Sequence, residues 1–79
     1  MPTLISLGGL KVRVYTREHE PMHVHVIGSD GAAKFNIEDD ITLVDNKGLS
    51  SKEISKSKEI IKTNIDNIRS EWKRIVRNE

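Results

Sequence analysis

The sequence predicts an α+β domain, in which one long C-terminal helix covers one face of an antiparallel meander sheet of four or five strands. Two observations indicate the sheet. Apolar and polar side chains alternate in short runs over residues 3–45, and turns rich in glycine or polar residues separate these runs. A third observation indicates the helix, because residues 51–77 contain no Gly or Pro and repeat apolar side chains at steps of three, four and seven.

The composition of the chain excludes several classes of protein. Its 79 residues are expected to form a single domain over residues 1–79. The chain contains no Cys, which excludes a disulfide framework or a thiolate metal site and fits a reducing cytoplasm. No apolar run approaches the roughly 20 residues of a membrane-spanning helix. We therefore expect a cytoplasmic protein without a membrane partner.

The turns between the expected strands set their registers. A Gly-Gly turn at residues 8–9, a loop over residues 17–21 and a turn over residues 28–31 fix which side chains lie opposite one another. They predict the apolar pairs Leu7–Leu10, Ile5–Val12, Val14–Val24, Val12–Val26, Val26–Ala33, Val24–Phe35 and Met22–Ile37. Since all of these pairs fall on one side, the sheet is expected to have one apolar face and one polar face.

The C-terminal helix is expected to follow Ser50, which forms a capping box with Glu53. Its apolar stripe consists of Ile54, Ile61, Ile65, Ile68, Trp72, Ile75 and Val76. A helix over residues 51–77 would be roughly 40 Å long, about twice the width of the sheet, so it overhangs unless it bends or breaks. The overhanging end would form an exposed apolar patch. We expect self-association through the residues of this patch, Trp72, Ile75 and Val76.

The polar face of the sheet carries the candidate site. The predicted registers arrange its side chains in two rows that cross the strands, Tyr15–His23–Asn36 and Arg13–His25–Lys34, with Leu4 as a neighbour of Arg13. The third histidine, His19, lies on the preceding loop at the rim of this face. The residues predicted to bind a partner are therefore Arg13, Tyr15, His23, His25, Lys34 and Asn36.

One interpretation of this face is a metal site formed by His19, His23 and His25. A His-x-His pair on a strand places two imidazoles on one face at ligand spacing, and His19 could fold over them as a third ligand for zinc, copper or nickel. The neighbouring Arg13 and Lys34 would repel a cation, and the candidate carboxylates are Glu18, Glu20 and Glu38. We expect no cofactor, with a divalent transition metal as the alternative.

A second interpretation is an anion or phosphodiester site. Arg13, Tyr15 and Lys34, together with the two histidines of the strand, could hold a phosphate group. His23 and His25 could also divide the acid and base roles in metal-independent RNA cleavage. We favour binding over cleavage, and the question of whether the protein is an enzyme stays open.

A third interpretation of the polar face is structural. Exposed strand positions commonly carry Lys, Arg, Tyr or His, and cross-strand pairs of these side chains stabilise a sheet. Alternatively, the same face meets a protein partner. The histidines need no chemical role under this interpretation.

The chain resembles DUF4160, a family of small bacterial proteins of unknown function. The resemblance begins with Met-Pro-Thr-x-Ile at residues 1–5, centres on His-Glu-Pro-Met-His-Val-His-Val at residues 19–26 and ends with a long helix carrying Trp72. Three features depart from the family pattern, since Glu18 replaces an aspartate, Met22 replaces a second proline and the helix lacks an additional tryptophan. The resemblance implies that the signature residues are His19, His23 and His25.

The resemblance also implies a toxin–antitoxin-like setting, because members of the family are often encoded beside another small protein. Together with the polar face, it leads us to expect a module that binds a protein partner, with RNA as a further candidate. The alternative is a metal-binding protein or a metal-independent ribonuclease centred on the three histidines.

Overall fold

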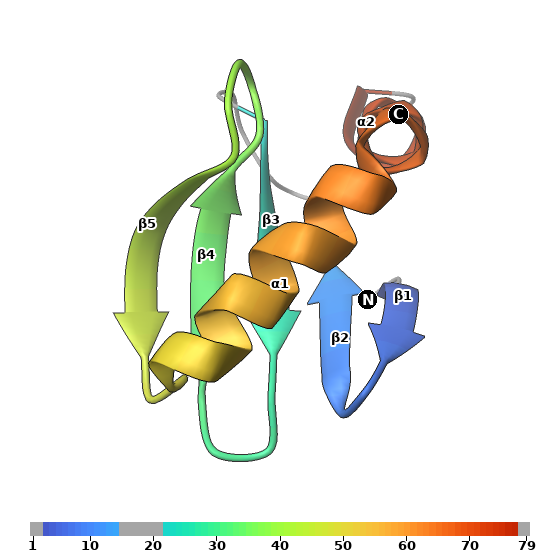
Figure 1. Cartoon of the computed structure of the whole chain (residues 1–79). Helices are drawn as coiled ribbons and strands as arrows, with labels where there is room; N and C mark the ends of the chain where they lie inside the picture. Colours follow the sequence, from blue (N-terminus) through green and yellow to red (C-terminus); the bar gives the residue numbers. More distant parts are fainter. Residues whose placement is uncertain (1–2, 15–21, 78–79) are drawn as a thin grey trace.

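The computed structural model describes residues 3–14 and 22–77. Within these residues, a five-stranded antiparallel sheet is followed by two helices (Figure 1). The strands lie in the sheet in chain order, as β1 (Thr3–Leu7), β2 (Leu10–Arg13), β3 (His23–Ile27), β4 (Ala32–Asn36) and β5 (Thr42–Lys47). The helices are α1 (Ser51–Thr63) and α2 (Ile65–Arg77). The predicted α+β class and the antiparallel meander are thus confirmed.

The predicted registers are confirmed where the first four strands pair, except at the start of β1. Ile5 lies opposite Val12, Val12 lies opposite Val26, and Val24 lies opposite Phe35. All of these side chains except that of Ile5 are fully buried in the core on the apolar face, and Ile5 packs against the core. The parity of the sequence pattern therefore assigned the two faces correctly, because a slip of one residue would have exchanged them.

Strand β1 departs from the expected pairing at its start. Its register with β2 shifts between Thr3 and Ile5, so that Thr3 lies opposite Arg13. The expectation that Leu4 would be the neighbour of Arg13 is therefore wrong. A β-bulge adds one residue to one strand, and alternation alone does not reveal such an insertion.

Strand β5 carries a second irregularity. Lys34 lies opposite Asp45 and Phe35 lies opposite Leu43, which leaves Val44 as an extra residue in β5. The strand ends at Lys47, two residues beyond the predicted end of the sheet at residue 45. The bulge resets the side-chain parity, so that Asp45 lies in the same row as Lys34 of the polar face.

The prediction of a single helix over residues 51–77 is wrong, because the helix is interrupted at Asn64. The Asn64 backbone N–H donates to the carbonyl oxygens of Ile60 and Ile61 at 3.3 and 3.2 Å, and its Nδ2 donates to Ile60 O at 2.8 Å. Ile68 N–H then donates to Asn64 O at 2.9 Å, which begins the next helix. An asparagine side chain competes in this way for backbone groups, which explains its preference for helix ends.

The break turns α2 away from the line of α1, so that its apolar side chains pack into the core. Figure 1 shows α1 crossing the sheet diagonally, with α2 turned so that it is seen almost end-on. Trp72 is fully buried, and Ile75 and Val76 are packed against the core. The prediction that these three residues form an exposed apolar patch is therefore wrong. The largest fully buried apolar side chains are those of Trp72, Phe35, Ile37, Ile61, Ile68, Val12, Val14, Val24 and Val26.

Arg69 of α2 forms hydrogen bonds to the segment that follows β4. Its Nε donates to Ile37 O and its guanidinium NH2 donates to Asp39 O, each at 3.1 Å. These two contacts satisfy carbonyl groups where the chain leaves β4.

In the part of the chain that the structure describes, neither helix is long and apolar enough to cross a membrane.

Candidate functional site

The polar face, which is the side of the sheet opposite the helices, has a central row that crosses four strands. Arg13 of β2 pairs with His25 of β3, His25 pairs with Lys34 of β4, and Lys34 pairs with Asp45 of β5. The predicted row Arg13–His25–Lys34 is thus confirmed, and Asp45 extends it. Neighbours in such a row have Cβ atoms about 5 Å apart, which lets adjacent side chains contact one ligand.

The second predicted row is confirmed where the structure describes it. His23 of β3 lies opposite Asn36 of β4. The other two residues expected on this side of the face, Tyr15 and His19, lie outside the described residues. Their part in the site, and with it the set of three histidine ligands, stays a prediction.

Glu38 holds the start of the strand that carries both histidines. Its Oε1 accepts a hydrogen bond from Met22 N–H at 2.8 Å, and its own N–H donates to Asn36 Oδ1 at 2.9 Å. Ile37 N–H also donates to Met22 O at 2.8 Å. Glu38, one of the candidate metal carboxylates, thus serves to position β3 against β4, and the Asn36 side chain is engaged in the same network.

The two histidines of β3 form a compact pair. Their ring centroids lie 5.5 Å apart with an interplanar angle of 78°, an edge-to-face arrangement. His23 is buried, with 7% of its surface exposed, whereas His25 is half-buried. A ligand that approaches the polar face from solvent therefore meets the His25 ring before the His23 ring.

The histidine pair is the candidate centre of a metal site. Across residues 3–14 and 22–77, the structure contains no group of three or more His, Cys, Asp or Glu side chains that could hold a metal ion. His23 and His25 would supply two nitrogen ligands, and a tetrahedral zinc site requires at least one more from the protein. The described residues thus supply two of the three predicted histidine ligands, and the metal site stays a prediction.

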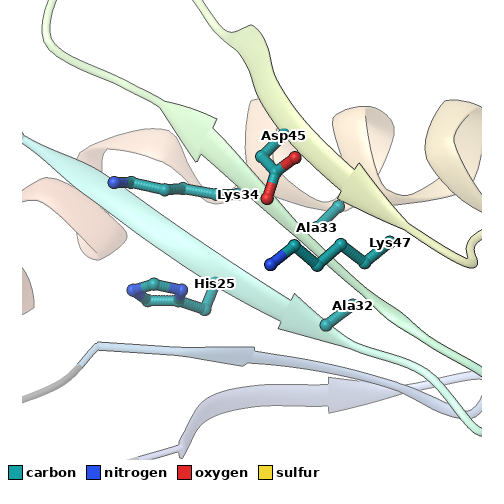
Figure 2. A pocket seen from close by; sticks show the side chains of 6 residues that line it. All are labelled: His25, Ala32, Ala33, Lys34, Asp45 and Lys47. Carbon is teal, nitrogen blue, oxygen red and sulfur yellow. The ribbon is translucent and has the colours of Figure 1, made fainter.

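A shallow pocket lies beside His25 on the polar face. It has a volume of about 260 Å³ and is lined by His25, Ala32, Ala33, Lys34, Asp45 and Lys47. Figure 2 shows that these side chains come from three neighbouring strands, with Asp45 and Lys47 contributed by β5. Ala32 lies opposite Lys47 in the sheet, and its small side chain lines part of the pocket.

Asp45 and Lys47 were not among the predicted site residues. The alternation around residue 45 predicted a strand there, but it did not predict how that strand pairs with β4. The extra residue Val44 also shifts which side chains face outward, so the strand pattern alone could not place Asp45 beside Lys34.

Arg13 contributes an unsatisfied donor to the face. Its Nε atom is buried and has no hydrogen-bond partner among the residues that the structure describes. A buried donor without a partner costs about 1–3 kcal/mol, so such an atom favours an incoming acceptor. Phosphate and carboxylate oxygens are the acceptors that a guanidinium binds best.

Positive charge dominates the described part of this face. Its ionised side chains there are the cations Lys11, Arg13, Lys34 and Lys47 and the carboxylates of Asp45 and, just beyond β4, Glu38. The whole chain, in contrast, carries a formal net charge of only +1. The arrangement can hold an anion that spans several strands, and the ring of His25 can stack on a planar group.

Comparison with known proteins identifies the family of this chain. Searches of curated proteins and of solved structures find no match to this chain. A family model described as a domain of unknown function, DUF4160, matches residues 9–73, which include β2 to β5, α1 and most of α2. The chain therefore belongs to the DUF4160 family.

Proposed function

We propose that the protein is a binding module that holds single-stranded RNA on the polar face of its sheet. The observation that carries this proposal is the excess of four cations over two carboxylates on the described part of that face. The helices leave this face uncovered, so an extended strand of RNA can cross the rows from β2 to β5. The Nε of Arg13, which has no hydrogen-bond partner among the described residues, is an additional donor for a phosphate oxygen once the side chain turns outward.

The chemistry of the face favours phosphates over bases. Lysine and arginine side chains neutralise phosphates and release counterions, and each phosphate contact contributes about −0.7 to the salt slope for a single strand. Four contacts would give a slope of roughly −3. His25 is the one described ring on this face that is half-exposed, so base stacking adds little sequence preference.

This proposal fits the toxin–antitoxin-like module that the family resemblance implies. In such a setting, a small protein acts on a nucleic acid, on a protein or on both. A protein partner would use the same face, because its carboxylates would meet the same cations.

Reversing the charge of Lys34 should weaken RNA binding about tenfold or more. Lys34 lies between His25 and Asp45 in the central row, so a glutamate there adds a second carboxylate beside Asp45. The measurement is fluorescence anisotropy of a labelled single-stranded RNA of about twelve nucleotides. The Lys34→Glu variant and the original protein are compared at two salt concentrations.

Lys58→Glu is the matched control, since Lys58 is an exposed residue of α1, on the other side of the molecule. It changes the net charge equally, and its affinity should stay within about twofold of the original protein. The proposal fails if the original protein does not bind RNA. It fails equally if the two variants weaken binding to the same extent, because net charge would then be the cause.

A second candidate function is supported by the histidine pair. Rings 5.5 Å apart on one strand could divide acid and base roles in RNA cleavage, or bind a transition metal together with His19. Under this alternative, protein purified without a histidine tag would contain stoichiometric zinc, copper or nickel, or would cleave RNA. A His23→Ala/His25→Ala variant would lose that property. Cleavage that survives in the double variant would eliminate a catalytic role for the pair.

A further inference from the structure

Strand β5 is an edge strand of the sheet, and two of its exposed side chains are large and apolar. All six residues of β5 are exposed, and α1 crosses the sheet in a direction that leads away from β5 (Figure 1). The exposed large hydrophobic side chains of the described chain are Leu7, Leu43 and Val44. Two of these three therefore lie next to each other on this one edge, with exposed fractions of 38% for Leu43 and 55% for Val44.

We propose that two copies of the chain pair through β5, antiparallel and related by a two-fold axis at Asn46. An edge strand presents unpaired N–H and C=O groups, which a second strand can satisfy. A two-fold axis gives a closed dimer in which each copy uses the same strand. The sheets of the two copies then join into one continuous sheet, with both polar faces on the same side.

Charge complementarity selects this register. In an antiparallel pair centred on Asn46, Asp45 of each copy lies opposite Lys47 of the other. A pair centred on Asp45 would instead oppose the two carboxylates, and a pair centred on Lys47 would oppose the two ammonium groups. Opposite charges directly across an antiparallel pair stabilise it and like charges destabilise it, so the register centred on Asn46 is favoured.

The apolar residues of the edge fit the same arrangement. In the register centred on Asn46, Val44 lies opposite Gly48 of the other copy. Gly48 is exposed and has no side chain, so the valine meets no opposing side chain. Leu43 then lies opposite the chain just after that glycine, where the strand ends and α1 is about to begin. Pairing would thus cover both exposed apolar side chains of β5.

Dimerisation through β5 would also change the pocket beside His25. Asp45 and Lys47 line that pocket from the edge strand. In the dimer, Lys47 of each copy lies beside Asp45 of the other, which offsets the negative charge of Asp45. The two pockets then lie on one continuous surface, which lengthens the track available to a bound anion.

The test is sedimentation velocity of the full chain from about 5 to about 500 μM, without nucleic acid. The sedimentation coefficient should rise with concentration as dimer forms. Asp45→Lys and Lys47→Glu should each weaken dimerisation about tenfold, because each places like charges opposite one another twice in the dimer. The double variant Asp45→Lys/Lys47→Glu should restore it, because it exchanges the charges and keeps the pairs opposite.

A strictly monomeric protein at every concentration would overturn the inference. A dimer that is insensitive to both single variants, or that the double variant does not restore, would also overturn it, since the interface would then lie elsewhere. Thermal unfolding of each variant serves as the control for folding. Both residues are exposed, so their replacement should change stability by no more than about 0.5 kcal/mol.

This inference stands apart from RNA binding. The sedimentation experiment contains no nucleic acid, and the anisotropy experiment varies Lys34 and Lys58, which lie outside β5. A dimer that fails to bind RNA would retain the edge pairing and refute the proposed function. A monomer that binds RNA would refute the edge pairing and support the proposed function.

Discussion

Replacing Trp72 by Ala is expected to lower the free energy of unfolding by about 3–5 kcal/mol. The Trp72 side chain is fully buried and is the largest of the buried side chains, so its removal leaves a cavity between α2 and the sheet. A domain of 79 residues has a net stability of roughly 4–12 kcal/mol. The loss would be a large fraction of that stability. Urea unfolding followed by circular dichroism measures the change without relying on tryptophan fluorescence.

Ile75→Ala is the matched control in the same helix. Ile75 is partly buried against the core, so its truncation should cost clearly less, about 1–2 kcal/mol. If Trp72→Ala were as stable as the original protein and instead changed its sedimentation, Trp72 would lie at an interface. That result would restore the overhanging helix that the sequence predicts and contradict the broken helix.

Replacing Gly31 by Ala is expected to destabilise the domain by about 3 kcal/mol. A Cβ atom at Gly31 would lie 2.7 Å from both C and Cα of Gly48, and closer still to Lys47 O. These are backbone atoms, so the clash is relieved only if the turn before β4 moves away from the end of β5. Thermal or urea unfolding would measure the loss.

Gly9→Ala separates this clash from the general cost of removing a glycine. Gly9 has φ 80°, and a Cβ atom there would meet nothing within 4 Å. Its replacement should therefore cost only the strain of a left-handed conformation, about 1–2 kcal/mol. Equal losses for the two variants would show that the close approach of residue 31 to residue 48 does not exist in solution.

The sheet could be predicted from the sequence because two simple rules agree. Side chains alternate along a strand, and short turns fix which residues meet. Together these rules placed Val12 opposite Val26 and Val24 opposite Phe35. The same parity placed His25 between Arg13 and Lys34, so the centre of the candidate site was predictable as well.

The helical layer could not be predicted in the same way. The apolar stripe continues through residues 54–76 without a Gly or Pro, so the pattern gives no sign of a break. The break depends on Asn64, whose backbone and side chain both donate to Ile60 O. An asparagine within a helical pattern is a weak signal, and burial of Trp72 in the folded domain favours the broken form.

The outer part of the site was missed for a different reason. Asp45 and Lys47 reach the polar face because β5 pairs with β4 through a bulge at Val44. A bulge inserts a residue and leaves no mark in the alternation of a short strand. The pocket that these two residues line beside His25 was therefore not visible in the sequence.

An NMR titration with single-stranded RNA tests the central claim most directly. The claim is that the polar face of the sheet, and not the helical layer, binds RNA through its cations. Backbone amide spectra should then change at Arg13, His25 and Lys34, while the exposed residues of α1 and α2 stay unchanged. Shifts confined to the helices, or no shifts at RNA concentrations far above that of the protein, would contradict it.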